Sequence, residues 1–221
     1  MRARIAAACQ DAGRDVSQVQ LLAVSKTFPA ASVQQALDAG QRDFGENYIQ
    51  EAVAKIGELA GMPAVWHCIG PIQGNKTRLV AEHFDWAQSV DRLKIAQRLS
   101  DQRPAHLAPL QVCIQVNTDG GPTKAGVTPE ALPELARAIS RLPRLRLRGL
   151  MTIPEPAADF TSACALHARA RALFDALNAQ GLALDTLSMG MSADVEAAIH
   201  AGSTMVRVGT AIFGGRTRTT A

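Results

Sequence analysis

The sequence is poor in aromatic residues and nearly balanced in charge. Aromatic residues make up 4% of the 221 residues, and the formal net charge is +3. Binding of nucleic acid needs aromatic stacking platforms and a basic surface, so this composition argues against it. The one tight basic cluster, Arg144, Arg146 and Arg148, alternates with leucines, which is typical of one polar face of a strand.

Long apolar runs and closely spaced cysteines are also missing. No run is long enough and apolar enough to cross a bilayer, and no secretory signal is recognisable. The four cysteines, Cys9, Cys68, Cys113 and Cys164, lie far apart, which predicts neither a metal site nor a redox pair. We therefore expect a cytoplasmic protein without a membrane partner.

The content of hydrophobic residues, 47%, is that of a globular protein, and strand-like runs alternate with helix-like segments. Strands are expected at 21–26, 41–44, 64–69, 85–89, 110–116, 145–151, 184–188 and 204–208. Such alternation predicts parallel strands with crossover helices. It favours a single (β/α)8 TIM barrel with an N-terminal helix at 2–12 over an open doubly wound sheet. Without a linker-like stretch, residues 1–221 are expected to form one domain.

Lys26 follows a short apolar run, Leu21 to Val24, that reads as a buried strand closed by Pro29. The chain has few lysines, and the carboxyl ends of barrel strands are where such folds place their chemistry. Lys26 is therefore a candidate nucleophilic amine. The alternative is a surface lysine just past a strand.

The loops after the last two strands indicate a phosphate site. Phosphate commonly binds at these loops in TIM barrels. A helix is expected to begin at Ser192, so that its hydroxyl and the first free N–H groups can meet an anion. Gly209 allows close backbone approach, and Thr210 adds a hydroxyl. The alternative for Ser192 is a simple helix cap.

A lysine and a phosphate site on one barrel face suggest pyridoxal 5′-phosphate (PLP), whose aldehyde needs an amine and whose phosphate needs an anion site. Arg207, on the last strand, would then face the pyridine nitrogen. A permanent cation there disfavours protonation of that nitrogen, so we expect a weak electron sink and little carbanion chemistry.

Six motifs, in this order, resemble those of the YggS/PROSC family of pyridoxal phosphate homeostasis proteins. They are VSKT (24–27), FGENY (44–48), WHCIGPIQGNK (66–76), LRGLMTIP (147–154), LSMGMSAD (187–194) and VRVGTAIFG (206–214). The resemblance implies a barrel similar to the N-terminal domain of bacterial alanine racemase, the fold-type III arrangement. It implies that Lys26 carries PLP as an internal aldimine. It also implies a cofactor site formed by Lys26, Asn47, His67, Met189, Ser192, Arg207, Gly209 and Thr210, with His67 at a strand end.

The family resemblance implies binding, buffering or delivery of PLP without robust catalytic turnover. The alternatives are a PLP-dependent, racemase-like enzyme and a barrel aldolase that uses Lys26 without a cofactor. Racemisation needs a second base, and the only tyrosine, Tyr48, is expected to be structural; the chain also ends at Ala221, just after the expected barrel. We expect a monomer that meets apo PLP-dependent enzymes transiently. Lys124 matches a loop lysine of the family and is either a second amine for transfer or an exposed loop residue.

Overall fold

The computed structural model describes residues 1–120 and 125–215. In this part of the chain, eight parallel strands close into one barrel in the order β1 to β8. The strands are β1 (Gln20–Val24), β2 (Asp43–Glu46), β3 (Val65–Cys68), β4 (Trp86–Val90), β5 (Leu110–Gln115), β6 (Leu145–Met151), β7 (Thr186–Ser188) and β8 (Met205–Val208). The (β/α)8 barrel expected from the sequence is confirmed.

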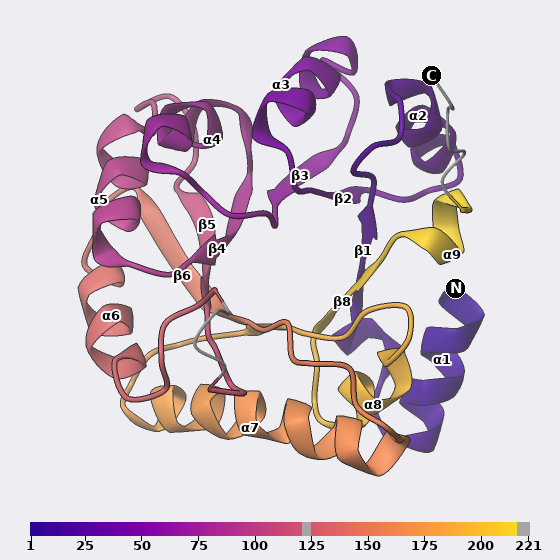
Figure 1. Ribbon diagram of the computed structural model, residues 1–221. Helices are drawn as coiled ribbons and strands as arrows, with labels where there is room; N and C mark the ends of the chain where they lie inside the picture. Colours follow the sequence, from indigo (N-terminus) through magenta and orange to yellow (C-terminus); the bar gives the residue numbers. More distant parts are fainter. Residues whose placement is uncertain (121–124, 216–221) are drawn as a thin grey trace.

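Helices surround the barrel, as Figure 1 shows. They are α1 (Arg2–Asp11), α2 (Ala30–Asp38), α3 (Ile49–Glu58), α4 (Thr77–His83), α5 (Leu93–Gln102), α6 (Leu132–Ile139), α7 (Phe160–Ala179), α8 (Val195–His200) and α9 (Thr210–Phe213). The longer helices bury apolar residues against the strands; in α6 the buried residues Leu132, Leu135, Ala136 and Ile139 follow the helical period. The N-terminal helix α1 lies against α8, and both cover β8.

Most strand boundaries differ from the sequence prediction by one or two residues, and β1 ends at Val24 rather than at residue 26. Two differences have a clear local cause. The second strand begins at Asp43 rather than at residue 41, because the buried Gln41 side chain donates to the carbonyls of Leu21 and Asp43 and ends the preceding turn. The helix after β7 begins at Val195 rather than at Ser192. Residues 192–194 form a turn instead, closed by the Asp194 carboxylate, which accepts from the Met191 N–H at 2.6 Å.

The barrel interior is separate from the core beneath the helices. The two larger apolar clusters combine strand and helix residues and fill the layer between sheet and helices. Two smaller clusters contain no helix residue: one joins Leu22, Val24, Ile69 and Met205, and the other joins Val65, Trp86, Cys113 and Met151. Because side chains alternate along a strand, these residues face the barrel axis. Polar side chains lie between the two interior clusters and are described below.

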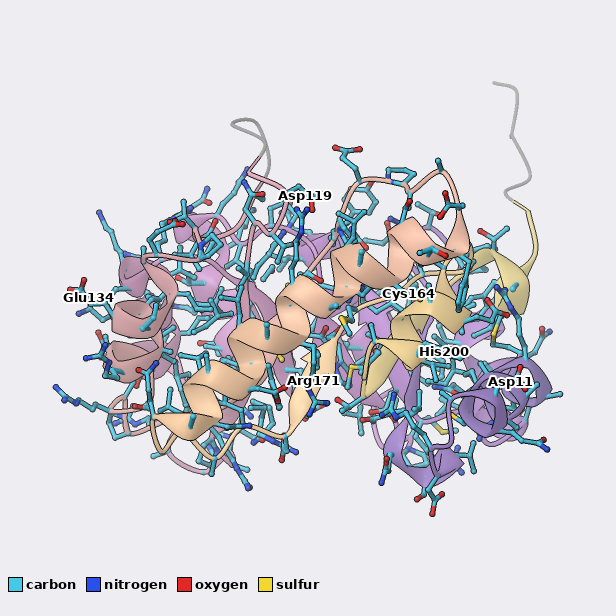
Figure 2. The ribbon with its side chains drawn as sticks, turned by 90° about the horizontal axis from the view of Figure 1, so that it is seen from below. Asp11, Asp119, Glu134, Cys164, Arg171 and His200 are labelled. Carbon is cyan, nitrogen blue, oxygen red and sulfur yellow. The ribbon has the colours of Figure 1, made fainter. Side chains whose placement is uncertain are left out.

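A long helix, α7, lies on the outer surface. Figure 2 shows α7, which carries Cys164 and Arg171, lying across the barrel beside α8, which carries His200. The Cys164 thiol donates to the Ala197 carbonyl at 3.7 Å, which links the two helices.

Among the described residues, no cluster of three or more His, Cys, Asp or Glu could hold a metal ion. No helix in these same ranges is long and apolar enough to cross a membrane.

Candidate functional site

Four neighbouring strand ends bring most of the predicted site residues together. The carboxyl ends of β7, β8, β1 and β2 adjoin one another around the barrel. Lys26 lies two residues after β1, and Arg207 on β8 is paired in register with Leu22 on β1. Gly209 directly follows β8, where a Cβ atom would lie only 3.1 Å from the Val24 carbonyl oxygen. The glycine therefore lets the segment after β8 lie close beside the turn that carries Lys26.

Lys26 is partly buried, and its amine has no hydrogen bond or ion pair with any described residue. Its two chain neighbours, in contrast, are held firmly. The Ser25 hydroxyl donates to Glu46 Oε1 at 2.6 Å, and the Thr27 N–H donates to Glu51 Oε1 at 2.8 Å. The turn is thus fixed on both sides of a lysine whose amine is left available.

The anchor beneath this turn is a buried ion pair. Lys55 Nζ lies 2.6 Å from Glu46 Oε1 and donates to the Ser25 carbonyl at 3.0 Å. Burial raises the pKa of the Glu46 carboxyl, and the hydrogen bonds from Lys55 and Ser25 oppose that rise. A buried charge of this kind is tolerated only when it is paired and hydrogen-bonded. The ion pair between Glu46 and Lys55 was not predicted from the sequence, in which Lys55 is one polar residue of a helical segment.

Arg207 is a buried cation whose acceptors are neutral. Its Nη1 donates to Ser188 Oγ at 2.9 Å and its Nη2 donates to the Thr152 carbonyl at 2.8 Å. No other hydrogen bond or ion pair joins its guanidinium to a described residue, so donors remain for a ligand. Burial lowers the pKa of Arg207 to about 10, which leaves it positively charged near neutral pH.

The loop after β7 is tied down from two helices. Asp194 accepts from His167 on α7 at 2.9 Å and from the Met191 N–H, and both bonds help to hold the pKa of its carboxyl low despite burial. Arg4 on α1 donates to the Ser192 carbonyl at 2.7 Å and pairs with Glu196. The Ser192 hydroxyl has no partner among the described residues. Although Ser192 does not begin a helix, it lies in a well-held turn beside the β8 end.

The short helix α9 follows β8 and contacts the segment after β1. It begins at Thr210, whose side chain is exposed, directly after Gly209. The rings of Phe213 on α9 and Phe28 stack with centroids 5.0 Å apart. Thr210 is thereby held beside the Lys26 turn, as the phosphate-site prediction requires.

Asn47 and Thr152 carry buried polar atoms that have no hydrogen-bond partner among the described residues. Asn47 directly follows β2, and its Oδ1 is buried without a hydrogen bond; the same holds for Thr152 Oγ1, next to the Arg207 contact. A Cβ on Gly70 would lie 2.2 Å from the Asn47 carbonyl oxygen, so glycine is required to seat Asn47. Unsatisfied buried polar atoms of this kind are rare and are satisfied when a ligand or water binds.

Two predicted site residues lie elsewhere. Met189 is fully buried in the layer between strands and helices, because it alternates with the inward-facing Ser188. Its side chain therefore does not line the open end of the barrel. His67 is not at a strand end: β3 continues through Cys68, and the fully buried imidazole lies inside the barrel. Lys124 lies outside the described residues.

Comparisons with known proteins show the family to which the chain is similar. The family described as "Alanine racemase, N-terminal domain" matches residues 1–217. A protein of Pseudomonas aeruginosa named "Pyridoxal phosphate homeostasis protein" is 63% identical over 214 residues, which covers 97% of this chain and 92% of the relative. An Escherichia coli K12 protein of the same name is 53% identical, covering 98% of this chain and 94% of that protein. The solved structure of PipY from Synechococcus elongatus with PLP bound has a TM-score of 0.84 at 40% identity, covering 97% of this chain and all of PipY.

Proposed function

This chain belongs to the family of pyridoxal phosphate homeostasis proteins, within the alanine racemase N-terminal domain family, and we propose that it binds PLP through Lys26. In this role it takes part in PLP homeostasis by binding, buffering or delivering the cofactor. The observation that carries the proposal is the free amine of Lys26, set in a turn whose neighbours are both anchored, beside the end of β8.

The polar groups at the strand ends fit this cofactor. Asn47 Oδ1 and Thr152 Oγ1 have no partner among the described residues and can form hydrogen bonds to polar atoms of a ligand. The buried guanidinium of Arg207 also has N–H donors that no described residue uses. When bound, PLP supplies an aldehyde that condenses with a primary amine and releases water. Lys26 would supply that amine, and Asn47 would lie beside the bound ring.

The anionic part of the ligand would lie at the loops after β7 and β8. Ser192 and Thr210 would donate their hydroxyls to phosphate oxygens, and Gly209 leaves space for close backbone contact. Arg207 would donate to the ring nitrogen and hold that atom unprotonated. Met189 has no side-chain role in this proposal, because the side chain belongs to the outer core.

We further propose that the protein binds its cofactor without robust catalytic turnover. With the cation of Arg207 at its ring nitrogen, the cofactor would be a weaker electron sink, which would lower reactivity at a bound amino acid. The relatives named above carry the name of homeostasis proteins, which supports the same reading. Transient delivery to apo PLP-dependent enzymes and a monomeric state stay predictions, as does any part played by Lys124.

Reductive labelling tests the proposal directly. The protein is incubated with PLP, the absorption band of the bound cofactor is recorded, and borohydride reduction is followed by peptide mapping. Label on Lys26, lost in Lys26→Ala and retained in the control Lys76→Ala, is expected. Label on another lysine, or no stable band, contradicts the proposal. Alanine or serine racemisation that scales with protein and needs Lys26 contradicts the non-catalytic part.

A further inference from the structure

A continuous row of polar side chains crosses the barrel interior. Arg207 Nη1 lies 2.9 Å from Ser188 Oγ, and Ser188 Oγ lies 2.7 Å from Gln88 Oε1. Gln88 Nε2 lies 2.9 Å from His67 Nδ1, and His67 Nε2 lies 3.1 Å from Asp43 Oδ1. We call these five residues the interior chain. It starts near the proposed cofactor site and ends at Asp43, the first residue of β2, at the opposite end of the barrel.

The members of the interior chain occupy positions that barrels normally fill with apolar side chains. His67, Gln88 and Ser188 have no exposed surface, and Arg207 is 4% exposed. His67 and Gln88 lie two residues beyond the interior residues Val65 and Trp86, so they face the same way. The His67 ring also stacks on Trp86, with centroids 5.1 Å apart. Burying this many polar groups is costly unless each is hydrogen-bonded, so packing alone does not explain them.

The direction of the hydrogen bonds in the interior chain follows from its Asp43 end. The Asp43 carboxylate only accepts, so His67 Nε2 carries a proton, and a ring that stays neutral in this fully buried position accepts at Nδ1. The Gln88 amide nitrogen then donates to His67 Nδ1 and contacts Met205 Sδ at 3.1 Å. This leaves Gln88 Oε1 to accept from the Ser188 hydroxyl, whose oxygen accepts from Arg207.

We propose that His67 and Gln88 are positioning residues: through Ser188 they hold Arg207 in the orientation that meets the cofactor ring. The proposal rests on the proposed function and extends it to residues that do not touch the cofactor. Turning the Gln88 amide over would place its oxygen against the unprotonated Nδ1 of the neutral His67 ring, so this ring keeps the amide in one orientation. The tautomer of a histidine deep in the barrel is thereby coupled to the orientation of the cation at the ring nitrogen.

Substitutions at the far end of the interior chain provide the test. His67→Leu removes both hydrogen bonds of the imidazole, whereas His67→Gln can still accept from Gln88 and donate to Asp43. Cys68→Ala, a fully buried neighbour on the opposite face of β3, is the control for a general loss of packing. Each variant is titrated with PLP, and the position and pH dependence of the bound cofactor's absorption band are recorded.

We expect His67→Leu and Ser188→Ala to weaken PLP binding about tenfold and to shift the absorption band, because Arg207 loses its fixed acceptor. His67→Gln and Cys68→Ala should keep the wild-type band. If His67→Leu keeps both affinity and band within twofold of wild type, or if Cys68→Ala shifts them equally, the proposal is wrong.

A second measurement needs neither a variant nor the cofactor. Nitrogen-15 shifts of the His67 ring in the ligand-free protein should show a neutral imidazole protonated on Nε2 at pH 7. A neutral ring protonated on Nδ1, or a cationic ring, overturns the interior chain even if Lys26 binds PLP. Conversely, a failed label at Lys26 with the expected tautomer would contradict the proposed function and leave the chain itself intact.

Discussion

Glu46 Oε1 and Lys55 Nζ lie 2.6 Å apart in a pair that is almost fully buried, and both residues also bind Ser25, the neighbour of Lys26. The side chains are 0% and 4% exposed. A lysine that must react as an amine needs a fixed backbone, and this pair supplies it from β2 and α3. One lysine of the chain thus serves as a structural cation while another keeps its amine free.

Breaking this pair should be costly. Lys55→Met leaves the Glu46 carboxylate buried without its cation, and we expect the free energy of unfolding to fall by about 3–5 kcal/mol. Glu46→Gln should lower it similarly, and the double variant should lose clearly less than the sum of both single losses, since no unpaired charge remains. Urea denaturation measures all three.

Glu51→Gln is the matched control for the same cluster. Glu51 is 38% exposed and lies 3.4 Å from Lys55, so its removal should cost less than about 1 kcal/mol. Equal losses at Glu46 and Glu51 would show that burial does not set the strength of the anchor.

Thr27 adopts a strained backbone conformation next to Lys26. Within the described ranges it is the non-glycine residue with positive φ, at +68°, a region that β-branched residues disfavour. Asparagine tolerates this region, so Thr27→Asn should raise the free energy of unfolding by about 1 kcal/mol. Thr27→Val, which keeps the branch at Cβ, should change it by less than about 0.5 kcal/mol. Thermal denaturation of both variants measures these changes. If Thr27→Asn does not raise the free energy of unfolding, the backbone at residue 27 is not strained.

Arg4 should act on ligand binding more than on stability. It donates to the Ser192 carbonyl, and its pair with Glu196 is more than one third exposed, so Arg4→Ala should cost less than about 1 kcal/mol of stability. The loosened turn at Ser192 should weaken PLP binding by about three- to tenfold, measured by titration, while borohydride still labels Lys26. Arg2→Ala, on the same helix, should leave the affinity unchanged. A stability loss without a change in affinity would contradict the role of Arg4.

The sequence predicted the barrel well because most strands are short apolar runs and the longer helices carry an apolar stripe. It also predicted that Lys26, Arg207 and Gly209 come together, since the carboxyl ends of neighbouring parallel strands share one face. The residue at which a strand ends was predicted less well than the strand itself. His67 was expected at a strand end, yet β3 continues for one more residue.

Residues that act through partners distant in sequence were missed. Lys55 pairs with a residue nine positions earlier on another element, and Gln88 and Ser188 are 100 positions apart. Neither contact can be predicted from the spacing of apolar residues within one helix or strand. The one usable signal was a polar Gln88 in a strand that is otherwise apolar on its inward face, where Trp86 precedes it by two positions.

The buried imidazole of His67 should make stability depend on pH in a defined window. Burial lowers the pKa of His67 from its usual value of 6.5, an effect only partly opposed by the carboxylates of Asp43 and Asp85. Below about pH 6.5 the unfolded chain binds a proton that the folded ring excludes, so stability is present above that pH and is lost as the pH falls. The slope should approach about 1.4 kcal/mol per pH unit.

Comparison with His67→Gln isolates this contribution. Asp43 and Asp194 have lowered pKa values, so these two carboxyl groups change the free energy of unfolding only below about pH 4, outside the measured range. The raised pKa of Glu46 acts in the opposite sense, since its stabilisation is lost as pH rises, but it is common to both proteins and cancels in the difference. Urea denaturation at pH 5.0 to 7.5 should therefore give a shallower decline towards acid for His67→Gln than for wild type. Parallel curves would mean that the folded protein accommodates a charged imidazole, because only a ring that stays neutral on folding can produce the difference.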